Sequence, residues 1–368
     1  MPEKLAPPPP AQPSSPVDRA GRSSKRRRST MQDIASAVGM SIGSVSDILN
    51  EREGRSYSDE AKQRVHDAVR SVGYVSNRRA QMLARRQSNE IGLLFTRDFR
   101  NPYFAETIER LRQHVLGVGL VPTLELRSDW YEAGDQSVRS LFADGAAGLL
   151  VGPIYSPEDL AMVERIRAIN GRVVFFGGRV DSGSDLVAID LYRGGQIAAQ
   201  HAVEAGHTRM AYLGPNPVGR TIEKAAGIAD TLRDAGLLDA VMFHTVDFST
   251  SRPLHQCIQD FVQRWLGCPE DERPTVCLCM NDYVANAAMN AFRNAGVSLP
   301  DQLSFVGYDD IAEAQYLAPP LTTVYGGADE QIRVASELIA RWIREDIPPA
   351  EQTVLEPRLV PRSSVVPR

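Results

Sequence analysis

The chain has 368 residues, of which 43% are hydrophobic and 24% are charged. These shares are close to those of ordinary globular proteins, so they exclude a wholly disordered, collagen-like or disulfide-scaffold protein. The length leaves room for two or three domains. The net charge of −5 hides an asymmetry, because residues 1–88 carry 16 basic and 9 acidic side chains whereas residues 89–368 carry 25 and 37. This division indicates that the two parts of the chain meet different partners.

The N-terminal part begins with a stretch that cannot pack. Residues 1–24 are rich in proline and serine and hold little apolar surface, so we expect a disordered arm there. Residues 25–76 are the expected headpiece, and within it helical periodicity runs from about 31 to 74. Apolar side chains at helical spacing predict three short helices, and the residues that end or cap them are Gly39, Ser41, Ser58 and Gly73.

The first two of these helices, joined by a tight turn, are typical of a helix-turn-helix, whose second helix enters the major groove of DNA. On spacing alone, any small helical bundle is about as good an interpretation. The excess of basic side chains in the same region favours DNA, because arginine and lysine neutralise phosphates and release counterions.

From residue 90 onward, short apolar runs alternate with amphipathic segments, which predicts parallel sheets covered by helices on both faces, in two lobes. No repeat of fixed period is visible. The expected strands are 91–95, 120–124, 147–151, 173–176, 209–213, 240–244, 275–280 and 303–306. The expected helices are 104–117, 133–142, 157–169, 192–205, 222–235, 254–266 and 283–295.

The four cysteines form no C-x-x-C pair, and Cys277 and Cys279 alternate within an apolar run, so we interpret them as reduced core residues on one side of a strand. The basic run 25–28 is not followed by an apolar segment, which excludes a secretory signal there. No uncharged apolar stretch is long enough to span a membrane. We therefore expect a cytoplasmic protein without metal, cofactor or catalytic residues, since no phosphate-binding loop, zinc motif or nucleophile motif is present.

An ordered set of motifs resembles the lactose-repressor (LacI/GalR) family of transcriptional regulators over roughly residues 29 to 362. The resemblance implies a helix-turn-helix headpiece, a hinge helix and a two-lobed α/β core of the periplasmic-binding-protein type. The motifs are Thr30–Ala35, Ala37–Ser41, Ser44–Ser46, Leu49–Asn50, Gly73–Tyr74, Asn77, Ala80, Leu83–Ala84, Ile91–Gly92, Asn101–Phe104, Gly206–His207, Asn281–Asp282, Gly307–Asp310 and Pro319–Thr323.

The resemblance places DNA contacts at the start of the second helix and in a hinge helix over residues 77–88. Two departures stand out at the second helix: Gly43 lacks the usual longer side chain, and Asp47 replaces a basic or polar residue. Asp47 can accept a hydrogen bond from a cytosine amino group or face solvent, which we slightly favour. The residues implied to contact DNA are Ile42, Gly43, Ser44, Ser46, Asp47, Asn50, Asn77, Arg78, Arg79 and Leu83.

In the hinge, paired helices of two subunits lie in the minor groove, and Leu83 wedges between base pairs. A basic linker is the alternative interpretation, but an exposed leucine among arginines would then lack a purpose. Ser76 replaces the proline that usually precedes the hinge asparagine.

The resemblance also places a small-molecule effector, a sugar or related metabolite, between the lobes. Its contacts are implied to be Tyr103, Phe104, Lys224, Phe248, Asn281 and Asp309. Core packing is the alternative for the three aromatic residues and ion pairing for Lys224, so a binding role is favoured over the alternative for Asn281, Asp309 and Lys224 alone. The small residues Gly178, Gly326 and Ala328 weakly favour a larger or anionic ligand over a hexose.

The implied lobes share the chain discontinuously. The first comprises residues 89–188 with about 325–343, the second residues 189–324 with about 344–362, and 363–368 form a tail. The C-terminal sequence has no apolar heptads, so a homodimer is expected rather than a tetramer. The resemblance implies that this dimer binds palindromic operator DNA and represses transcription.

Two alternatives belong to other classes of protein. A solute-binding transport protein would share the two-lobed fold, but it needs a signal peptide and lacks a headpiece. A sugar-metabolising enzyme would use Asp309, and turnover of candidate sugars would distinguish it. Both fit the motifs less well than a regulator.

Overall fold

The computed structural model describes residues 29–49, 55–73, 88–95, 102–126, 130–154, 157–169, 171–178, 185–215, 223–246, 253–350 and 352–368. The chain divides into two compact units, Met1–Ala84 and Arg85–Arg368. We call the described part of the first the headpiece and the second the core. The expected disordered arm and nearly all of the expected hinge helix lie outside the described residues.

The headpiece consists of three helices, α1 (Met31–Val38), α2 (Ile42–Leu49) and α3 (Asp59–Val72). Their ends are those that the sequence predicts. Gly39 and Gly73 end α1 and α3 in left-handed backbone, at φ of 69° and 62°, a conformation that glycine adopts without strain. The Ser41 hydroxyl accepts a hydrogen bond from Ser44 N at 3.0 Å, and the Ser58 hydroxyl one from Ala61 N at 3.2 Å. Apolar side chains from all three helices form one buried cluster.

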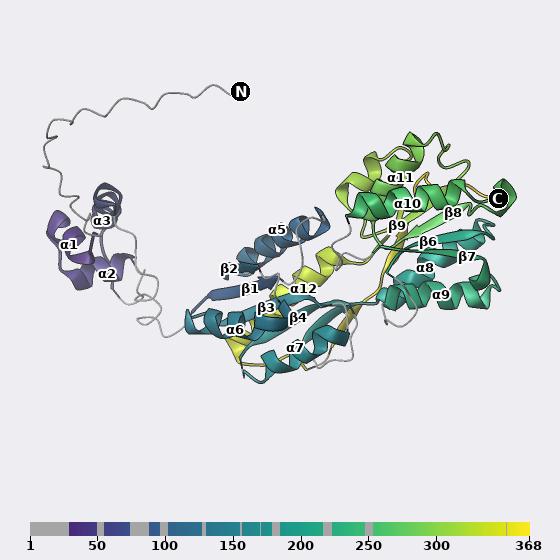
Figure 1. Cartoon of the computed structure of the whole chain (residues 1–368). Helices are drawn as coiled ribbons and strands as arrows, with labels where there is room; N and C mark the ends of the chain where they lie inside the picture. Colours follow the sequence, from purple (N-terminus) through teal and green to yellow (C-terminus); the bar gives the residue numbers. More distant parts are fainter. Residues whose placement is uncertain are drawn as a thin grey trace, which may run out of the picture. The chain divides into compact units, whose positions relative to one another are not determined.

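The core contains two six-stranded sheets, each with helices on both faces (Figure 1). The first lobe has the strand order β2-β1-β3-β4-β5-β11, and all its strands pair in parallel. Its strands are β1 (Glu90–Phe95), β2 (Val121–Leu126), β3 (Gly148–Ile154), β4 (Val173–Gly178), β5 (Leu186–Ile189) and β11 (Thr353–Leu355). Its helices are α5 (Pro102–Gly117), α6 (Trp130–Ala143), α7 (Pro157–Arg167) and α12 (Ala328–Glu345).

The second lobe repeats this order as β7-β6-β8-β9-β10-β12, with β12 antiparallel to β10. The duplication is therefore one of topology, without a fixed-period repeat in the sequence. Its strands are β6 (Met210–Gly214), β7 (Val241–Thr245), β8 (Val276–Cys279), β9 (Ser304–Tyr308), β10 (Thr322–Tyr325) and β12 (Arg358–Val360). Its helices are α8 (Leu191–Glu204), α9 (Glu223–Asp234), α10 (Leu254–Leu266) and α11 (Asp282–Asn294), with short 3₁₀ turns η1 (Leu238–Ala240), η2 (Glu270–Glu272) and η3 (Ala312–Tyr316).

Alternation along the buried strands explains the double covering. In β1, Leu94 packs into the cluster beneath α6 and α7, whereas Leu93 and Phe95 pack into the cluster beneath α5 and α12. The second sheet divides its side chains in the same way, between α10 and α11 on one face and α8 and α9 on the other. Strands that are apolar on both faces fit between two helical layers.

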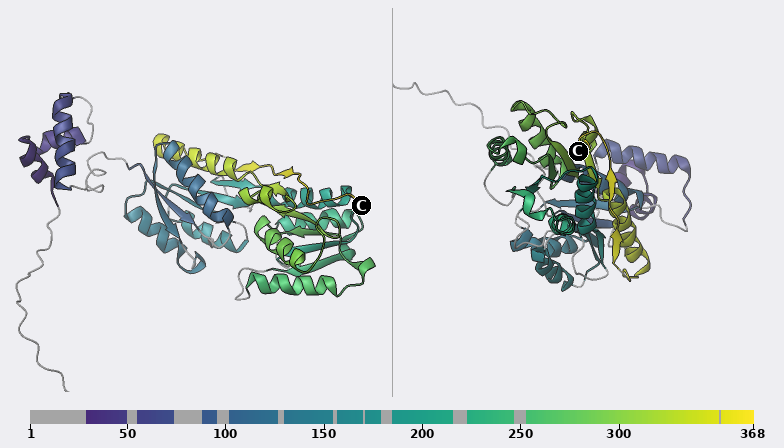
Figure 2. Two further views of the ribbon diagram at one scale, coloured as in Figure 1. Left: turned by 90° about the horizontal axis from the view of Figure 1, so that it is seen from above. Right: turned by 90° about the vertical axis from the view of Figure 1, so that its right-hand side faces the viewer.

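The chain passes between the lobes three times, after β5, after β10 and after β11. Helix α12 follows β10 of the second lobe but packs on the first, and the chain then returns to the second lobe (Figure 2). The amide of Gln331 fixes α12 to the first sheet by donating to the carbonyls of Gly177 and Val187, at 2.7 and 2.8 Å.

Two expected boundaries are wrong. Residues 344–362 do not all belong to the second lobe, because β11 pairs with β5 in the first sheet. Residues 363–368 are not a loose tail either. Ser364 is buried, and its hydroxyl accepts from Thr322 N at 2.7 Å and donates to Phe305 O at 2.6 Å. Backbone pairing with distant partners determines both outcomes, and a local pattern does not reveal such pairing.

All eight expected strands and all seven expected helices of the core are present, with ends that differ by up to three residues. Cys257, Cys277 and Cys279 are buried, and all four cysteines are free thiols. The sulfur atoms of Cys277 and Cys279 lie 3.7 Å apart, which confirms that both face one side of β8. Among the described residues, no helix has the length and apolar character needed to cross a bilayer.

Candidate DNA-binding surface and inter-lobe site

The start of α2 presents its outer side to solvent. Ser41, Ile42 and Gly43 are exposed, and Ile42 keeps 44% of its surface accessible, which is unusual for a large apolar side chain. Ser44 and Ser46 are half-buried. Four of the predicted DNA contacts therefore lie on the accessible part of α2 and its first turn.

Asp47 does not face solvent as expected. Its side chain is only 6% exposed, and its Oδ2 lies 3.0 Å from Arg55 Nη1 and 3.2 Å from the Tyr57 hydroxyl. A carboxylate that already accepts from a guanidinium and a phenol is a poor acceptor for a cytosine amino group. The structure therefore also counts against a direct contact between Asp47 and cytosine. The expectation missed the ion pair because Arg55 lies on a segment with no helical pattern.

The other predicted DNA contacts, Asn50, Asn77, Arg78, Arg79 and Leu83, lie outside the described residues. Apart from Arg55, the lysine and arginine side chains of the described headpiece lie on α3. Lys62 lies 3.7 Å from Asp59, Arg70 pairs with Asp67, and the Arg64 guanidinium donates to Val38 O.

A small pocket opens between the two lobes of the core, where about 280 Å³ of space, including open solvent, is free of protein atoms. It is situated beyond the carboxyl ends of the parallel strands, where open α/β sheets place their ligands. The first lobe lines it through the start of α5, and the second lobe through the residues that follow β9. The lining residues are Tyr103, Glu106, Thr107, Arg110, Asp309, Asp310, Ile311, Tyr325 and Ala328.

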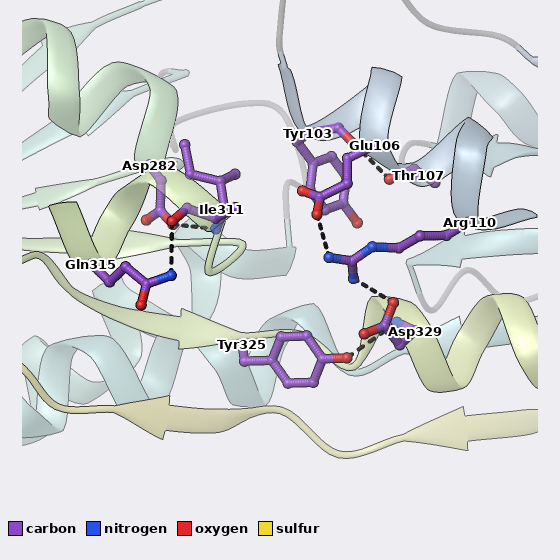
Figure 3. A network of polar contacts seen from close by, with 10 residues as sticks. Tyr103, Glu106, Thr107, Arg110, Asp282, Ile311, Gln315, Tyr325 and Asp329 are labelled. Carbon is purple, nitrogen blue, oxygen red and sulfur yellow. Dashed lines mark hydrogen bonds and ion pairs between the residues drawn. The ribbon is translucent and has the colours of Figure 1, made fainter. Parts of the chain in front are cut away.

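Arg110 is the centre of a polar network on the first-lobe wall of this pocket (Figure 3). Its guanidinium donates to Glu106, one turn earlier in α5, and to Asp329 in the first turn of α12. The Tyr325 hydroxyl accepts from Asp329 N at 3.1 Å. The network joins α5 to α12 and leaves the Arg110 charge neutralised.

Lys224 and Asp309 are two ionisable side chains of the second lobe that influence each other electrostatically. Lys224 Nζ donates to Met280 O at 2.7 Å and lies 3.4 Å from the centre of the Tyr308 ring. Burial lowers the pKa of Lys224 to about 8, against the opposing effect of Asp309 and Asp282. Burial likewise raises the pKa of Asp309 to about 7, and Lys224 opposes that rise. Asp309 also has positive φ, at 107°, which an L-residue rarely adopts.

Asp282 lies fully buried behind this pair. Its Oδ1 accepts from the Thr323 hydroxyl at 2.6 Å. Its Oδ2 accepts from Ile311 N at 3.0 Å, a contact that Figure 3 shows. Burial, followed by the nearby Asp309, raises the pKa of Asp282 to about 8. Its hydrogen bonds hold the segment after β9, so Asp282 supports the wall that carries Asp309 and Ile311.

The predicted effector contacts divide into three groups. Tyr103 and Asp309 line the pocket, and Lys224 is electrostatically coupled to Asp309. Asn281 is buried and caps α11, its Oδ1 accepting from Val284 N at 2.9 Å. Phe104 packs against the first-lobe core, with its ring 5.9 Å from that of Phe95, which is the packing alternative. Phe248 lies outside the described residues.

Sequence reasoning missed Arg110, Tyr325 and Asp282. Arg110 falls two turns after Tyr103 on the same helix, so its spacing could have indicated it. Tyr325 and Asp282 give no local signal, because their positions depend on strands far apart in the sequence. No group of three histidine, cysteine or carboxylate side chains within the described parts of the chain is arranged to hold a metal ion.

Comparisons with known proteins agree with these two regions. The bacterial regulatory proteins of the lacI family match residues 30–77, and a periplasmic binding protein-like domain matches residues 199–365. The transcriptional repressor PurR of Aliivibrio fischeri is 26% identical over 341 residues, spanning 92% of this chain and 99% of that protein. PurR of Photorhabdus laumondii is 28% identical over 347 residues, 92% of this chain and 97% of its own length.

Solved structures share the fold. The Lac repressor bound to ONPG in the repressed state superimposes with a TM-score of 0.76 at 22% identity, covering 92% of this chain and all of the other. The regulator CelR in complex with cellobiose gives a TM-score of 0.61 at 21% identity, with the same coverage.

Proposed function

Because the chain belongs to the lacI family of bacterial regulatory proteins, we propose that it is a dimeric repressor whose headpiece reads palindromic operator DNA and whose core closes on a sugar or related metabolite. One observation carries the proposal. A helix-turn-helix with an accessible second helix and a two-lobed core with a pocket between its lobes occur in one chain. The pairing of a DNA reader with a ligand-dependent hinge is what a metabolite-controlled regulator requires.

On the DNA side, we propose contacts from Ile42, Gly43, Ser44 and Ser46 together with Asn50. The hinge residues Asn77, Arg78, Arg79 and Leu83 complete the proposed surface in the minor groove. Asp47 enters this proposal with the role argued in the next subsection.

On the effector side, we propose that Tyr103 contributes apolar contact and that Asp309 accepts hydrogen bonds from ligand hydroxyl groups, with Lys224 setting the charge of Asp309. Arg110, the cation that lines the described pocket, is already paired with two carboxylates, and Lys224 donates to Met280 O and interacts electrostatically with Asp309. These pairings disfavour an anionic ligand and favour a neutral one rich in hydroxyl groups, contrary to the weak expectation from the small residues. Phe104 drops from the proposed contacts.

The relatives are repressors rather than enzymes, and we propose that this chain likewise performs no catalysis and acts in the cytoplasm. Incubation with candidate sugars and polyols followed by product analysis tests the first point. Turnover that Asp309→Asn abolishes would make the protein an enzyme.

The DNA experiment is selection from random-sequence duplexes with the full-length protein, followed by a salt titration. We expect one palindromic site, with a steep loss of affinity as salt rises. Equal affinity for all sequences would exclude a specific regulator. Leu83→Ala is expected to weaken binding to the selected site more than to a scrambled duplex, because wedging depends on the deformability of the sequence. Equal losses would count against wedging.

The effector experiment is a thermal-shift screen of sugars, polyols, sugar acids and nucleobases, since a ligand that binds the folded protein alone raises its melting temperature. We expect a neutral polyhydroxylated compound to stabilise the core. Stabilisation that survives Asp309→Ala would place the effector elsewhere. A compound that raises the melting temperature but leaves operator affinity unchanged would bind the protein without regulating its binding to DNA.

A further inference from the structure

The outward side of α2 contains a carboxylate where solvent or DNA would be expected. At 100° per residue, Gly43, Ser46 and Asp47 project from the side of the helix opposite the apolar residues Val45 and Ile48. Gly43, one turn before Asp47, is exposed, whereas Asp47 is 6% exposed. Some group outside α2 must therefore cover Asp47.

That group includes the side chains of Arg55 and Tyr57. Arg55 Nη1 lies 3.0 Å and the Tyr57 hydroxyl 3.2 Å from the same oxygen, Oδ2 of Asp47. The Arg55 side chain remains 68% exposed while it covers a carboxylate that is almost inaccessible. The Arg55 guanidinium is thus held at the outer side of α2 by its contact with Asp47, and the rest of the side chain remains accessible to solvent.

Arg55 differs in this respect from the other described cations of the headpiece. Arg64 donates to Val38 O at the end of α1, and Arg70 and Lys62 pair with carboxylates of α3, their own helix. Among the residues that the structure describes in the headpiece, Arg55 is the cation in contact with a side chain of α2.

Gly43 adds an independent observation. Its backbone does not have positive φ, and a Cβ built there would meet only the Ser41 hydroxyl, at 3.7 Å. Neither conformation nor packing within the headpiece calls for glycine, although glycine in a helix costs about 1 kcal/mol relative to alanine. A bare backbone one turn from the carboxylate leaves room for another molecule to approach beside Arg55.

We propose that Arg55 reads a guanine in the major groove from the outer side of α2, and that Asp47 is the positioning residue that holds its guanidinium there. The proposal rests on the proposed DNA binding. Arginine donates two parallel hydrogen bonds to O6 and N7 of guanine, and its planar fork suits such a contact better than lysine does. A carboxylate on one edge restricts the rotamers of the long side chain before DNA binds, so less conformational entropy is lost.

The test uses the full-length dimer and the palindromic duplex selected from random sequences. The probes are that duplex, versions with each base pair replaced in turn, and a scrambled duplex of equal length. Arg55→Gln is expected to reduce discrimination about tenfold at one G·C pair in each half-site, and Arg55→Lys, which keeps the charge, is expected to reduce it similarly. Full discrimination at every position in Arg55→Gln would overturn the proposal, as would a loss of affinity that is equal for all duplexes.

Asp47→Asn tests the positioning role, with Asp67→Asn as the matched control. Both variants remove one negative charge from the headpiece, and Asp67 is exposed and paired with Arg70 on α3. Both are expected to bind the scrambled duplex somewhat more tightly. Only Asp47→Asn is expected to lose discrimination at the G·C pair that Arg55 reads. A purely structural Asp47 would lower affinity for all duplexes together, and that result would overturn its role.

The DNA selection distinguishes a failure of the proposed function from a failure of the role proposed for Arg55. A wild-type protein that selects no site removes the proposed function and this inference with it. A wild-type protein that selects a site while Arg55→Gln reads it unchanged removes the inference alone. Arg55 is 68% exposed, so its replacement removes little packing, and far-ultraviolet circular dichroism checks that the headpiece of each variant stays folded. Base-pair discrimination is compared among the folded variants, so the Arg55 test decides the inference even where Asp47→Asn lowers headpiece stability.

Discussion

Asn281 and Asp309 follow adjacent strands of the second sheet, β8 and β9, yet one side chain caps a helix and the other lines the pocket. The Asn281 carbonyl oxygen is occupied by the backbone of α11, which it caps. Asp309 lines the inter-lobe pocket, close to the Lys224 ammonium. A ligand can bind Asp309 without disturbing the fold, whereas any substitution of Asn281 also affects the start of α11.

Asn281→Ala is therefore expected to lower the free energy of unfolding by about 1 kcal/mol, the usual cost of losing a side-chain cap. Asn281→Ser and Asn281→Asp keep a capping oxygen and should cost a few tenths of that. Urea unfolding of the three variants without ligand measures the difference. Equal stability of the alanine and serine variants would show that the cap contributes nothing.

The pKa of Asp309, about 7, predicts a pH dependence of effector binding. Below that pH the carboxyl is protonated and loses acceptor capacity, so a ligand that donates hydroxyl hydrogen bonds should bind roughly tenfold more weakly at pH 6 than well above pH 7. Asp309→Asn should bind weakly at every pH. Calorimetric titration between pH 5.5 and 8.5 tests this, and equal pH profiles for the wild type and the variant would exclude Asp309 as the titrating group.

At the scale of elements, residues 361–368 (the C-terminal segment) complete the second lobe. Phe305 N donates to Ser364 O at 2.8 Å and Arg368 N to Ala205 O at 2.8 Å. The Arg362 guanidinium reaches Asp310 at 2.6 Å, beside the pocket. The segment thus ties β9, the end of α8 and the pocket wall together.

Ser364→Ala should destabilise the core by about 1–3 kcal/mol, because the buried Thr322 N–H loses its acceptor. Ser363→Ala is the matched control, since that neighbouring side chain is exposed. Denaturant midpoints of the two variants provide the comparison. If Ser364→Ala leaves the denaturant midpoint unchanged, water must accept the hydrogen bond from Thr322 N in place of the serine hydroxyl.

Prediction from sequence succeeded at many places where the signal was local, but it did not include β5, β10 or the 18-residue amphipathic helix α12. Gly39, Ser58 and Gly73 lie beside the helices that they bound, and each long apolar run of the core became a strand. The three-residue strands β11 and β12 escaped prediction because partners far away in the chain define them. The same limit applies to the site: Asp309 follows a visible strand, whereas the burial of Asp282 depends on Thr323, and the environment of Asp47 depends on Arg55.

For the whole molecule, assembly into a dimer needs an apolar surface on the core. Strand β2 is an edge of the first sheet, and Leu124 and Leu126, which share one side of it, are 44% and 48% exposed. Leu116 of the neighbouring α5 is 45% exposed. Exposed leucines along an edge strand are a liability that a partner subunit would remove.

Replacing Leu124 and Leu126 by aspartate is therefore expected to convert the proposed dimer into a monomer and to abolish preference for a palindromic duplex. Sedimentation velocity and binding to half-site and full-site duplexes measure both effects. Ile347→Asp, at an exposed apolar residue beyond α12, serves as the control. A double variant that stays dimeric would place the interface on another face.

The threefold passage of the chain between the lobes has a consequence for biosynthesis. β11 completes the first sheet and β12 the second, although the remainder of the first sheet ends at Ile189. Neither lobe can close its sheet on the ribosome until residues 353–360 have left the exit tunnel. The headpiece, by contrast, needs only its own helices and can fold while the core is still being translated. A nascent chain that stalls before residue 353 would thus carry a finished DNA reader on two unfinished lobes.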